Sequence, residues 1–369
     1  MKKLIFRKIH KDTLNLFLLL CLSLGLIVWT IQAVNYLDFV TQDGHGLKTY
    51  LLYSIYNFPK IIHRLIPFIF FVSLFLILTN YESKNELLIF WTHGITKVKF
   101  ANRLIYLSII LLIFQIFIGG FISPHFQLKS RIMLKESNID FFSSLVKEGK
   151  FINAVKGLTI FIDKKNFDGS FNNIFIDDSS KQNTKMTYAS KGIIIDKNQS
   201  KVFRLYDGKV INKNRNKIND FDFDKIDINL SNYSTNTILT PKIQETSSKN
   251  LISCSFEHIY KKRNTDSRNC NISLIKEINQ EVFKRFYKPI YIPILAIICS
   301  FLIVLPKNSN KYSSQSKLTF LFGFSILIFS ETTLRYSSEN FYFSFIYLLA
   351  PWIIFIIIYI LFYFKVKNV

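Results

Sequence analysis

Six apolar stretches stand in two groups of three, on either side of one long polar segment at residues 124–285. A helix needs roughly 20 mostly apolar residues to cross about 30 Å of hydrocarbon, and most of these stretches approach that length. The expected spans are residues 14–37, 61–79, 104–122, 287–305, 318–329 and 341–364. The pattern predicts an α-helical polytopic membrane protein with six transmembrane helices, arranged three plus three around an inserted domain.

The same layout divides the chain of 369 residues into three parts. Residues 1–123 are expected to hold the first three spans, residues 124–286 the inserted domain with its helical connectors, and residues 287–369 the last three spans. The fifth span is the shortest, and its expected end at Phe329 meets the polar residues Ser330, Glu331 and Thr332.

Lysine and arginine residues indicate which side of the membrane each loop occupies, because cytoplasmic flanks carry an excess of positive charge. Such residues precede the first span, separate the second from the third and the fourth from the fifth, and follow the sixth: Lys2, Lys3, Arg7, Lys8, Lys11, Lys84, Lys97, Lys99, Arg103, Lys307, Lys311, Lys317, Lys365 and Lys367. We therefore expect both termini in the cytoplasm and the inserted domain outside. The first stretch is longer than the apolar region of a signal peptide, about 7–15 residues, and is expected to remain as an anchor.

The formal net charge of +22 raises the alternative of nucleic-acid binding. Topology signals and solvated lysines account for much of this charge, so we expect a membrane and no nucleic acid as partner. Cys21 and Cys299 lie inside expected spans and are interpreted as small apolar packing residues. Cys254 and Cys270 lie in the outer segment, where a disulfide could persist; the sequence leaves their pairing open.

The inserted segment contains the β-branched and aromatic runs that are typical of strands. These runs are residues 157–163, 171–177, 192–195, 201–206 and 221–230. The pair Asp207-Gly208 directly follows one of them and is a hairpin signal. Several short strands at such spacing favour a sandwich or jelly roll over a βαβ domain, so the insert is predicted to be an external β-jellyroll.

Motifs for catalysis are absent from the sequence. The six histidines are scattered, without an HExxH motif or a Cys/His spacing suited to zinc. The chain also lacks the glycine-rich phosphate loop of nucleotide hydrolases and the G-x-S-x-G elbow of hydrolases. We therefore expect no metal, no cofactor and no enzymatic activity in this chain.

The expected cytoplasmic loop between the second and third spans contains a short amphipathic run at residues 83–95. A helix capped by Ser83 and ended by Gly94 would present Leu87, Leu88 and Trp91 to a docking partner. The alternative is a helix that lies at the membrane interface, with Trp91 anchored among the lipid headgroups.

Polar side chains gather at the expected outer ends of three spans. They are Gln32 and Asn35 on the first span, Lys60, His63 and Arg64 on the second, and Lys284, Arg285 and Lys288 at the start of the fourth. The i, i+3 and i+4 spacing of the second group places its members on one helical face. Ionisable groups close to hydrocarbon are costly and mark pathways or bound headgroups, whereas the alternative is that they snorkel to ordinary lipid phosphates.

Taken together, these features resemble the LptF/LptG permeases of the lipopolysaccharide export ABC transporter, over essentially the whole chain. The run SKNELLIFWTHGI at residues 83–95 is similar to the family's coupling-helix segment, with Glu86 and Gly94 at its glutamate and glycine, although Trp91-Thr92-His93 departs from the usual residues. YASKG at 188–192 and LYDG at 205–208 resemble the jellyroll, and EVFKRFYKPIYIP at 281–293 resembles the start of the fourth span. Residues 28–32 and 37–40 look closer to LptF than to LptG.

The resemblance implies a permease that extracts lipopolysaccharide from the bacterial inner membrane and passes it to a periplasmic bridge. It implies three protein partners: a paralogous LptF/LptG-type permease, a cytoplasmic ATPase dimer that hydrolyses the ATP, and a periplasmic bridge jellyroll protein. The implied ATPase-coupling residues are Glu86, Leu87, Leu88, Trp91 and Gly94, and the implied substrate-binding residues are Gln32, Asn35, Lys60, Arg64 and Arg285.

Two other classes of membrane protein are alternatives to this one. A membrane-anchored sensor or scaffold would bind a ligand with its outer β domain, but such a protein usually carries a cytoplasmic output domain, and the inner segments here are short. Permeases of the macrolide-exporter type place their outer domain after the first of four spans, which the three-plus-three layout disfavours.

Overall fold

The structure is a computed structural model. It describes residues 2–37, 46–145, 148–155, 158–166, 169–179, 184–197, 200–214, 217–229, 242–261, 274–307, 309–339 and 341–367. The chain forms two compact units. Unit 1 consists of Met1–Thr30, Asn57–Leu128 and Lys242–Val369, and unit 2 consists of Ile31–Tyr56 and Lys129–Pro241.

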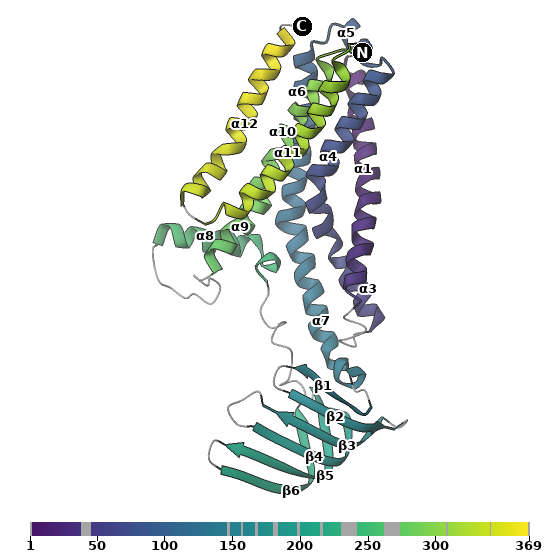
Figure 1. Ribbon diagram of the computed structural model, residues 1–369, viewed down its shortest axis with the longest axis vertical. Helices are drawn as coiled ribbons and strands as arrows, with labels where there is room; N and C mark the ends of the chain where they lie inside the picture. Colours follow the sequence, from purple (N-terminus) through teal and green to yellow (C-terminus); the bar gives the residue numbers. More distant parts are fainter. Residues whose placement is uncertain are drawn as a thin grey trace. The chain divides into compact units, whose positions relative to one another are not determined.

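Helices account for most of the described residues outside the insert (Figure 1). Before the sheet they are α1 (Lys2–Asn35), α3 (Leu47–Tyr56), α4 (Phe58–Ser83), α5 (Leu87–Thr92), α6 (Lys97–Phe117), the π-helical turn η1 (Ile118–Ile122) and α7 (Ser123–Leu145). After it they are η4 (Ile243–Glu245), α8 (Ser248–Lys261), α9 (Ile275–Val282), the π-helical turn η6 (Phe283–Tyr287), η7 (Lys288–Ile290), α10 (Tyr291–Ser300), η8 (Phe301–Ile303), α11 (Tyr312–Tyr336) and α12 (Phe341–Lys367).

Within the described residues, six helical segments are long and apolar enough to cross a membrane, which confirms the predicted number and the three-plus-three arrangement. They are Leu4–Asn35, Leu47–Ser83, Lys97–Leu134, Ile275–Ile303, Tyr312–Tyr336 and Tyr342–Lys367. The start of α1, the short helix α5 and the end of α12 lie at the same end of unit 1 (Figure 1). This arrangement agrees with an even number of spans, because an even number returns the chain to the side of the membrane on which it began.

The fifth span is longer than the sequence predicts, because α11 continues through the polar residues of its expected flank. The Ser330 hydroxyl donates to the carbonyl of Leu327 at 2.8 Å, and the Thr332 hydroxyl donates to that of Phe329 at 3.0 Å. Hydroxyl groups that bond to their own helix are compatible with its continuation. Glu331 therefore lies within the span and not beyond it.

Helix α10 is the centre of the bundle in unit 1. All ten of its residues are buried, and it packs against α4, α6, α11 and α12. A helix that is apolar on every side has no face suited to solvent and belongs in the interior. Cys299 of α10 and Cys21 of α1 are free and belong to this hydrophobic core. Cys254 of α8 is buried and disulfide-bonded, whereas Cys270 lies outside the described residues.

Unit 2 contains one six-stranded antiparallel sheet, in which each strand pairs with the next along the chain. Its strands are β1 (Lys150–Val155), β2 (Leu158–Lys165), β3 (Ser170–Asp178), β4 (Thr184–Lys197), β5 (Ser200–Asn214) and β6 (Lys217–Asn229). Side chains from several strands, such as Ile160, Ile174 and Phe203, form its hydrophobic core. Successive side chains of a strand point to opposite faces of the sheet, so every second residue can contribute to such a core. The predicted β insert is thus confirmed, and the described strands follow a simple up-and-down order rather than crossing over as in a jelly roll.

The hairpin predicted at Asp207-Gly208 is wrong. Strand β5 runs through both residues and stays paired with β4 and β6 on either side of them. Asp207 has a positive φ of 48°, and Ser190 donates a 2.6 Å hydrogen bond to its carbonyl. The pairing register is the same before and after Asp207 on both neighbouring strands, so the Asp-Gly pair here marks one residue with left-handed backbone inside a continuous strand instead of a turn between two strands.

Candidate functional site

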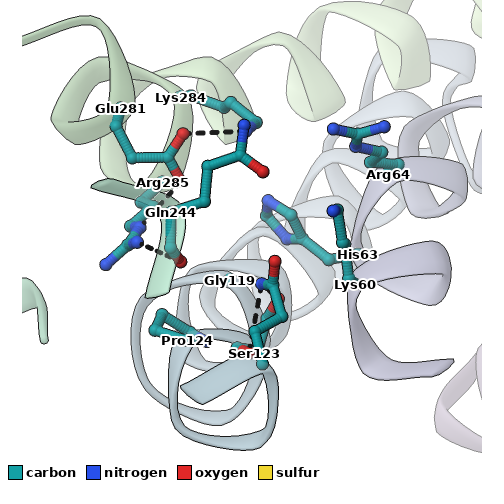
Figure 2. Close-up of a pocket in the computed structure, with 11 residues that line it drawn as sticks. Lys60, His63, Arg64, Gly119, Ser123, Pro124, Gln244, Glu281, Lys284 and Arg285 are labelled. Atoms are coloured by element: carbon teal, nitrogen blue, oxygen red, sulfur yellow. Dashed lines mark hydrogen bonds and ion pairs between the residues drawn. The ribbon is translucent and has the colours of Figure 1, made fainter. Parts of the chain in front are cut away.

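Basic side chains from the start of α4 and from η6 lie on opposite sides of a pocket within unit 1. Figure 2 shows Lys60, His63 and Arg64 on one side and Lys284 and Arg285 on the other. The spacing on α4 explains the first group, since residues three and four apart share a helical face. The π-helical turn η6 carries the second group.

An open cavity of about 300 Å³ adjoins this pocket. Its lining consists of His63, Arg64, Gln115, Lys284, Lys288 and Glu331. Three cations thus share the cavity with one carboxylate. Such an excess of positive charge in a partly enclosed space attracts anions, and guanidinium and ammonium groups form strong charge-assisted hydrogen bonds with phosphate oxygens.

The cations of the cavity differ in their partners. Lys284 contacts Glu281 at 2.8 Å, and Lys288 forms an ion pair with Glu331. Arg64 is exposed, and within the described part of the chain it forms no ion pair. Arg64 is therefore the cation of this cavity that a ligand reaches without displacing a carboxylate.

His63 forms part of the cavity wall and is held in place by the third span. Its side chain is only 7% exposed, and the Gln115 side chain donates a 3.2 Å hydrogen bond to its carbonyl. A Cβ added at Gly119 would lie 2.2 Å from Cε1 of the His63 ring, so only glycine permits this approach. Among the described residues, His63 Nδ1 and Gln115 Oε1 are buried without a hydrogen-bond partner, which leaves polar atoms for a ligand or water at this wall.

Arg285 is the most completely bonded cation of the group. It is 1% exposed and donates to Glu281 at 3.0 Å, to Ser248 at 2.9 Å, and to the carbonyls of Thr246 and Gln244 at 3.0 and 2.9 Å. Its guanidinium therefore connects the start of the fourth span to the segment that returns from the insert. A side chain with these partners is suited to a structural role, and its predicted role in substrate binding remains a prediction.

The other predicted substrate-binding residues are not among those that line the open cavity. Lys60 is half-buried and lines the narrow pocket of Figure 2, where the free space of about 10 Å³ holds at most one water molecule. Gln32 and Asn35 belong to unit 2; Asn35 is exposed, and Gln32 accepts a 3.4 Å hydrogen bond from Tyr36. A role for these three residues in ligand binding remains a prediction.

The predicted coupling segment forms the helix α5, which begins at Leu87 and not at Ser83, because Ser83 still belongs to α4. Gly94 follows the helix end with a φ of +68°, as expected of a glycine that ends a helix. Leu87 is 2% exposed and packs into the bundle core, whereas Leu88 and Ile89 are 56% and 47% exposed.

The side chains that flank Leu88 are fixed by contacts within the bundle. Trp91 is half-buried, with its ring 5.6 Å from that of Phe100, and Glu86 contacts Lys8 of α1 at 2.9 Å. The surface that α5 offers to a partner is therefore centred on Leu88 and Ile89.

Two residues of the cavity were missed by the sequence reasoning. Glu331 was assigned to the flank of the fifth span, and Gln115 lies in an apolar run that carries no motif. The rule that an ionisable residue inside a span is rarely there by chance would have found Glu331 if the span had been drawn to its full length. No sequence signal distinguishes Gln115.

Comparison with known proteins gives the chain its family. The model of the family described as lipopolysaccharide export system permease LptF/LptG matches residues 7–365. The uncharacterized protein RP871 of Rickettsia prowazekii (strain Madrid E) is 27% identical over 240 residues, which cover 63% of this chain and 66% of that protein. The match thus spans slightly less than two thirds of the relative's length.

The family includes both LptF and LptG, so the closer likeness to LptF stays a prediction. With its six apolar helices and a family match over nearly all of its length, this chain is a multi-pass membrane protein that belongs to the LptF/LptG family of lipopolysaccharide export system permeases.

Proposed function

We propose that this chain is a permease subunit that takes lipopolysaccharide from the membrane and exports it within an ABC transporter. The observation that carries the proposal is the 300 Å³ cavity in which Arg64, Lys284 and Lys288 gather beside apolar helices. A lipid with phosphates on its headgroup needs both features, cations for the phosphates and an apolar path for the acyl chains.

The energetics of the cargo explain why such a protein would need partners. Each CH₂ group exposed to water costs about 0.8 kcal/mol, so a lipid with several acyl chains cannot cross water unaided. The chain lacks a phosphate loop, and ATP hydrolysis is therefore assigned to a separate cytoplasmic ATPase dimer. The exposed Leu88 and Ile89 of α5 supply an apolar surface for its docking, beside the carboxylate of Glu86.

A second permease and a bridge protein complete the proposed assembly. The apolar surfaces of α1, α11 and α12 are extensively exposed in the single chain, which leaves room for a paralogous permease as well as lipid. Among the described strands of the inserted sheet, β1 and β6 lie at the edges. An edge strand presents unpaired backbone groups to which the strand of another protein can add, so a bridge protein with a similar β domain is a suitable partner there.

The proposed location is the bacterial inner membrane, with both termini and α5 in the cytoplasm and the β domain in the periplasm. The distribution of lysine and arginine in the short loops supports this orientation. The disulfide of Cys254 also supports it, because disulfides persist in the periplasm and are rare in the cytoplasm.

Affinity purification in mild detergent, followed by reconstitution, tests the proposal. We expect an ATPase and a second six-span protein to co-elute, and lipopolysaccharide to stimulate ATP hydrolysis by the reconstituted complex. A chain that co-elutes with a regulatory protein and without an ATPase would favour the sensor or scaffold alternative instead.

A further inference from the structure

The ion pair between Lys288 and Glu331 connects the start of the fourth span to the fifth, and both residues line the 300 Å³ cavity. The two partners differ in how far the protein covers them. The side chain of Lys288 is only 11% exposed, whereas that of Glu331 is 62% exposed. The carboxylate can therefore turn away from the pair, whereas the ammonium stays enclosed by the protein.

A largely buried ammonium group needs an anionic partner, because an uncompensated charge away from water is strongly destabilising. Glu331 provides that partner. Since it belongs to the same chain, its effective concentration at Lys288 is far higher than that of a dilute lipid. A ligand that takes Lys288 must therefore offer a better anion than this carboxylate.

A ligand can bind Arg64 without displacing a carboxylate, because Arg64 forms no ion pair within the described residues. A lipid with a single phosphodiester is thus satisfied by Arg64 alone, and it gains little from displacing Glu331. A lipid with two phosphate groups can place one on Arg64 and use the second to replace Glu331 on Lys288. The cavity thereby distinguishes ligands by the number of phosphates that they carry.

We propose that Glu331 is a specificity-determining residue, an internal counter-ion that reserves Lys288 for lipids with two phosphate groups and excludes ordinary phospholipids with one. This inference rests on the proposed function, since it assumes that the cavity faces a mixture of membrane lipids. It adds that selectivity against the abundant phospholipids arises from a carboxylate and not from the cations that hold the ligand.

Lipid binding by the full-length chain in micelles of dodecyl maltoside, a detergent without phosphate, tests the inference. The probes are lipid A with two phosphates, lipid A with one phosphate, and phosphatidylglycerol. The wild type should prefer the two-phosphate lipid. Glu331→Gln should tighten the binding of both one-phosphate lipids roughly tenfold, the equivalent of one charged hydrogen bond, and so reduce the preference. The exposed Glu339, near the end of the same span, gives the matched control, and Glu339→Gln should bind all three lipids like the wild type.

A second variant separates the role of Glu331 from a general change in charge. In a Lys288→Gln background Glu331 no longer has a lysine to pair with, so adding Glu331→Gln should no longer change the affinity for phosphatidylglycerol. An unchanged lipid preference in Glu331→Gln, or an equal gain in affinity with and without Lys288, would overturn the inference.

Failure of the proposed function gives a different result. In that case neither the wild type nor Glu331→Gln would bind either form of lipid A, while phosphatidylglycerol would still bind more tightly to Glu331→Gln. That outcome would support the counter-ion role and reject lipopolysaccharide as the cargo. Lipopolysaccharide transport by the wild type together with an unchanged lipid preference in Glu331→Gln would support lipopolysaccharide as the cargo and reject the counter-ion role.

Discussion

Lys8 of the first helix and Glu86 at the start of α5 form an ion pair, with Nζ 2.9 Å from Oε2. The side chain of Lys8 is 60% exposed and that of Glu86 is 28% exposed, so the pair lies at the surface. Exposed ion pairs contribute about 0–1 kcal/mol to stability. The two residues therefore offer a way to separate a structural role of Glu86 from a role in binding a partner.

Replacement of each partner by alanine should have unequal effects on transport. Lys8→Ala removes the ion pair and should leave the melting temperature and the coupled ATP hydrolysis near wild-type values. Glu86→Ala removes the same pair together with the proposed contact to the ATPase, and should sharply reduce coupled ATP hydrolysis in the reconstituted complex. Equal losses in both variants would show that the internal pair itself is what matters.

The neighbouring leucines of α5 provide a second matched comparison. Leu88→Asp changes a 56% exposed side chain and should weaken co-purification of the ATPase without lowering the melting temperature. Leu87→Asp places a carboxylate at a 2% exposed position and should destabilise the bundle by several kcal/mol. Normal ATPase recovery with Leu88→Asp would exclude this surface as the docking site.

Replacement of Arg285 should reduce stability rather than affinity. Breaking a buried ion pair by removing one partner costs about 3–5 kcal/mol, and here Glu281, Ser248 and two carbonyls lose a donor. We expect Arg285→Met to melt at a markedly lower temperature, and its folded fraction to bind lipopolysaccharide with wild-type affinity. A variant with normal melting and lost binding would instead assign Arg285 to the ligand, as first predicted from the sequence.

Gly119→Ala tests the close contact between η1 and His63. The added methyl group would lie 2.2 Å from the imidazole ring, and overpacking of this kind costs about 1–3 kcal/mol. Thermal unfolding should show that loss, and His63→Ala should restore the stability of Gly119→Ala because it removes the clash. Gly46→Ala serves as the control, since nothing lies within 4 Å of its added Cβ. Failure of the second substitution to rescue the first would contradict the packing described for His63.

Photocrosslinkers in the β domain test whether its apolar face carries the lipid. Ile160 and Ile174 lie in the core of the sheet at 6% and 2% exposure, whereas Tyr188 is 47% exposed. During ATP turnover, lipopolysaccharide should be captured at the two isoleucines more than at Tyr188. Equal capture at all three positions would indicate an ordinary closed core.

The sequence predicted the elements whose signal is local and periodic. Span length and alternation located the six spans and the β insert, because burial in lipid or in a sheet imposes a pattern that extends over many residues. It failed where one residue type serves two structures. Asp207-Gly208 lies inside a continuously paired strand although the pair is also common in turns, and Ser330 and Thr332 read as the end of a helix although their hydroxyls bond to its backbone.

The candidate site was predicted only in part, for a related reason. The cations near the membrane surface could be found by their cost in an apolar setting, but their partners come from distant parts of the chain. Arg285 and Lys288 are separated by only three positions, yet one is fully bonded by the returning segment and the other faces a carboxylate of the fifth span. Sequence spacing carries no information about such tertiary partners.

Charge reversal at Arg64 tests most directly the claim that this cavity binds the phosphates of lipopolysaccharide. Arg64→Glu and Arg335→Glu change the same charge, and both arginines are exposed, but only Arg64 lines the cavity. The measurement is the affinity of the reconstituted complex for lipopolysaccharide, with ATPase co-purification as the check on assembly. We expect a loss of at least tenfold with Arg64→Glu, about one charged hydrogen bond, and wild-type affinity with Arg335→Glu. Equal affinities in both variants and the wild type would contradict it.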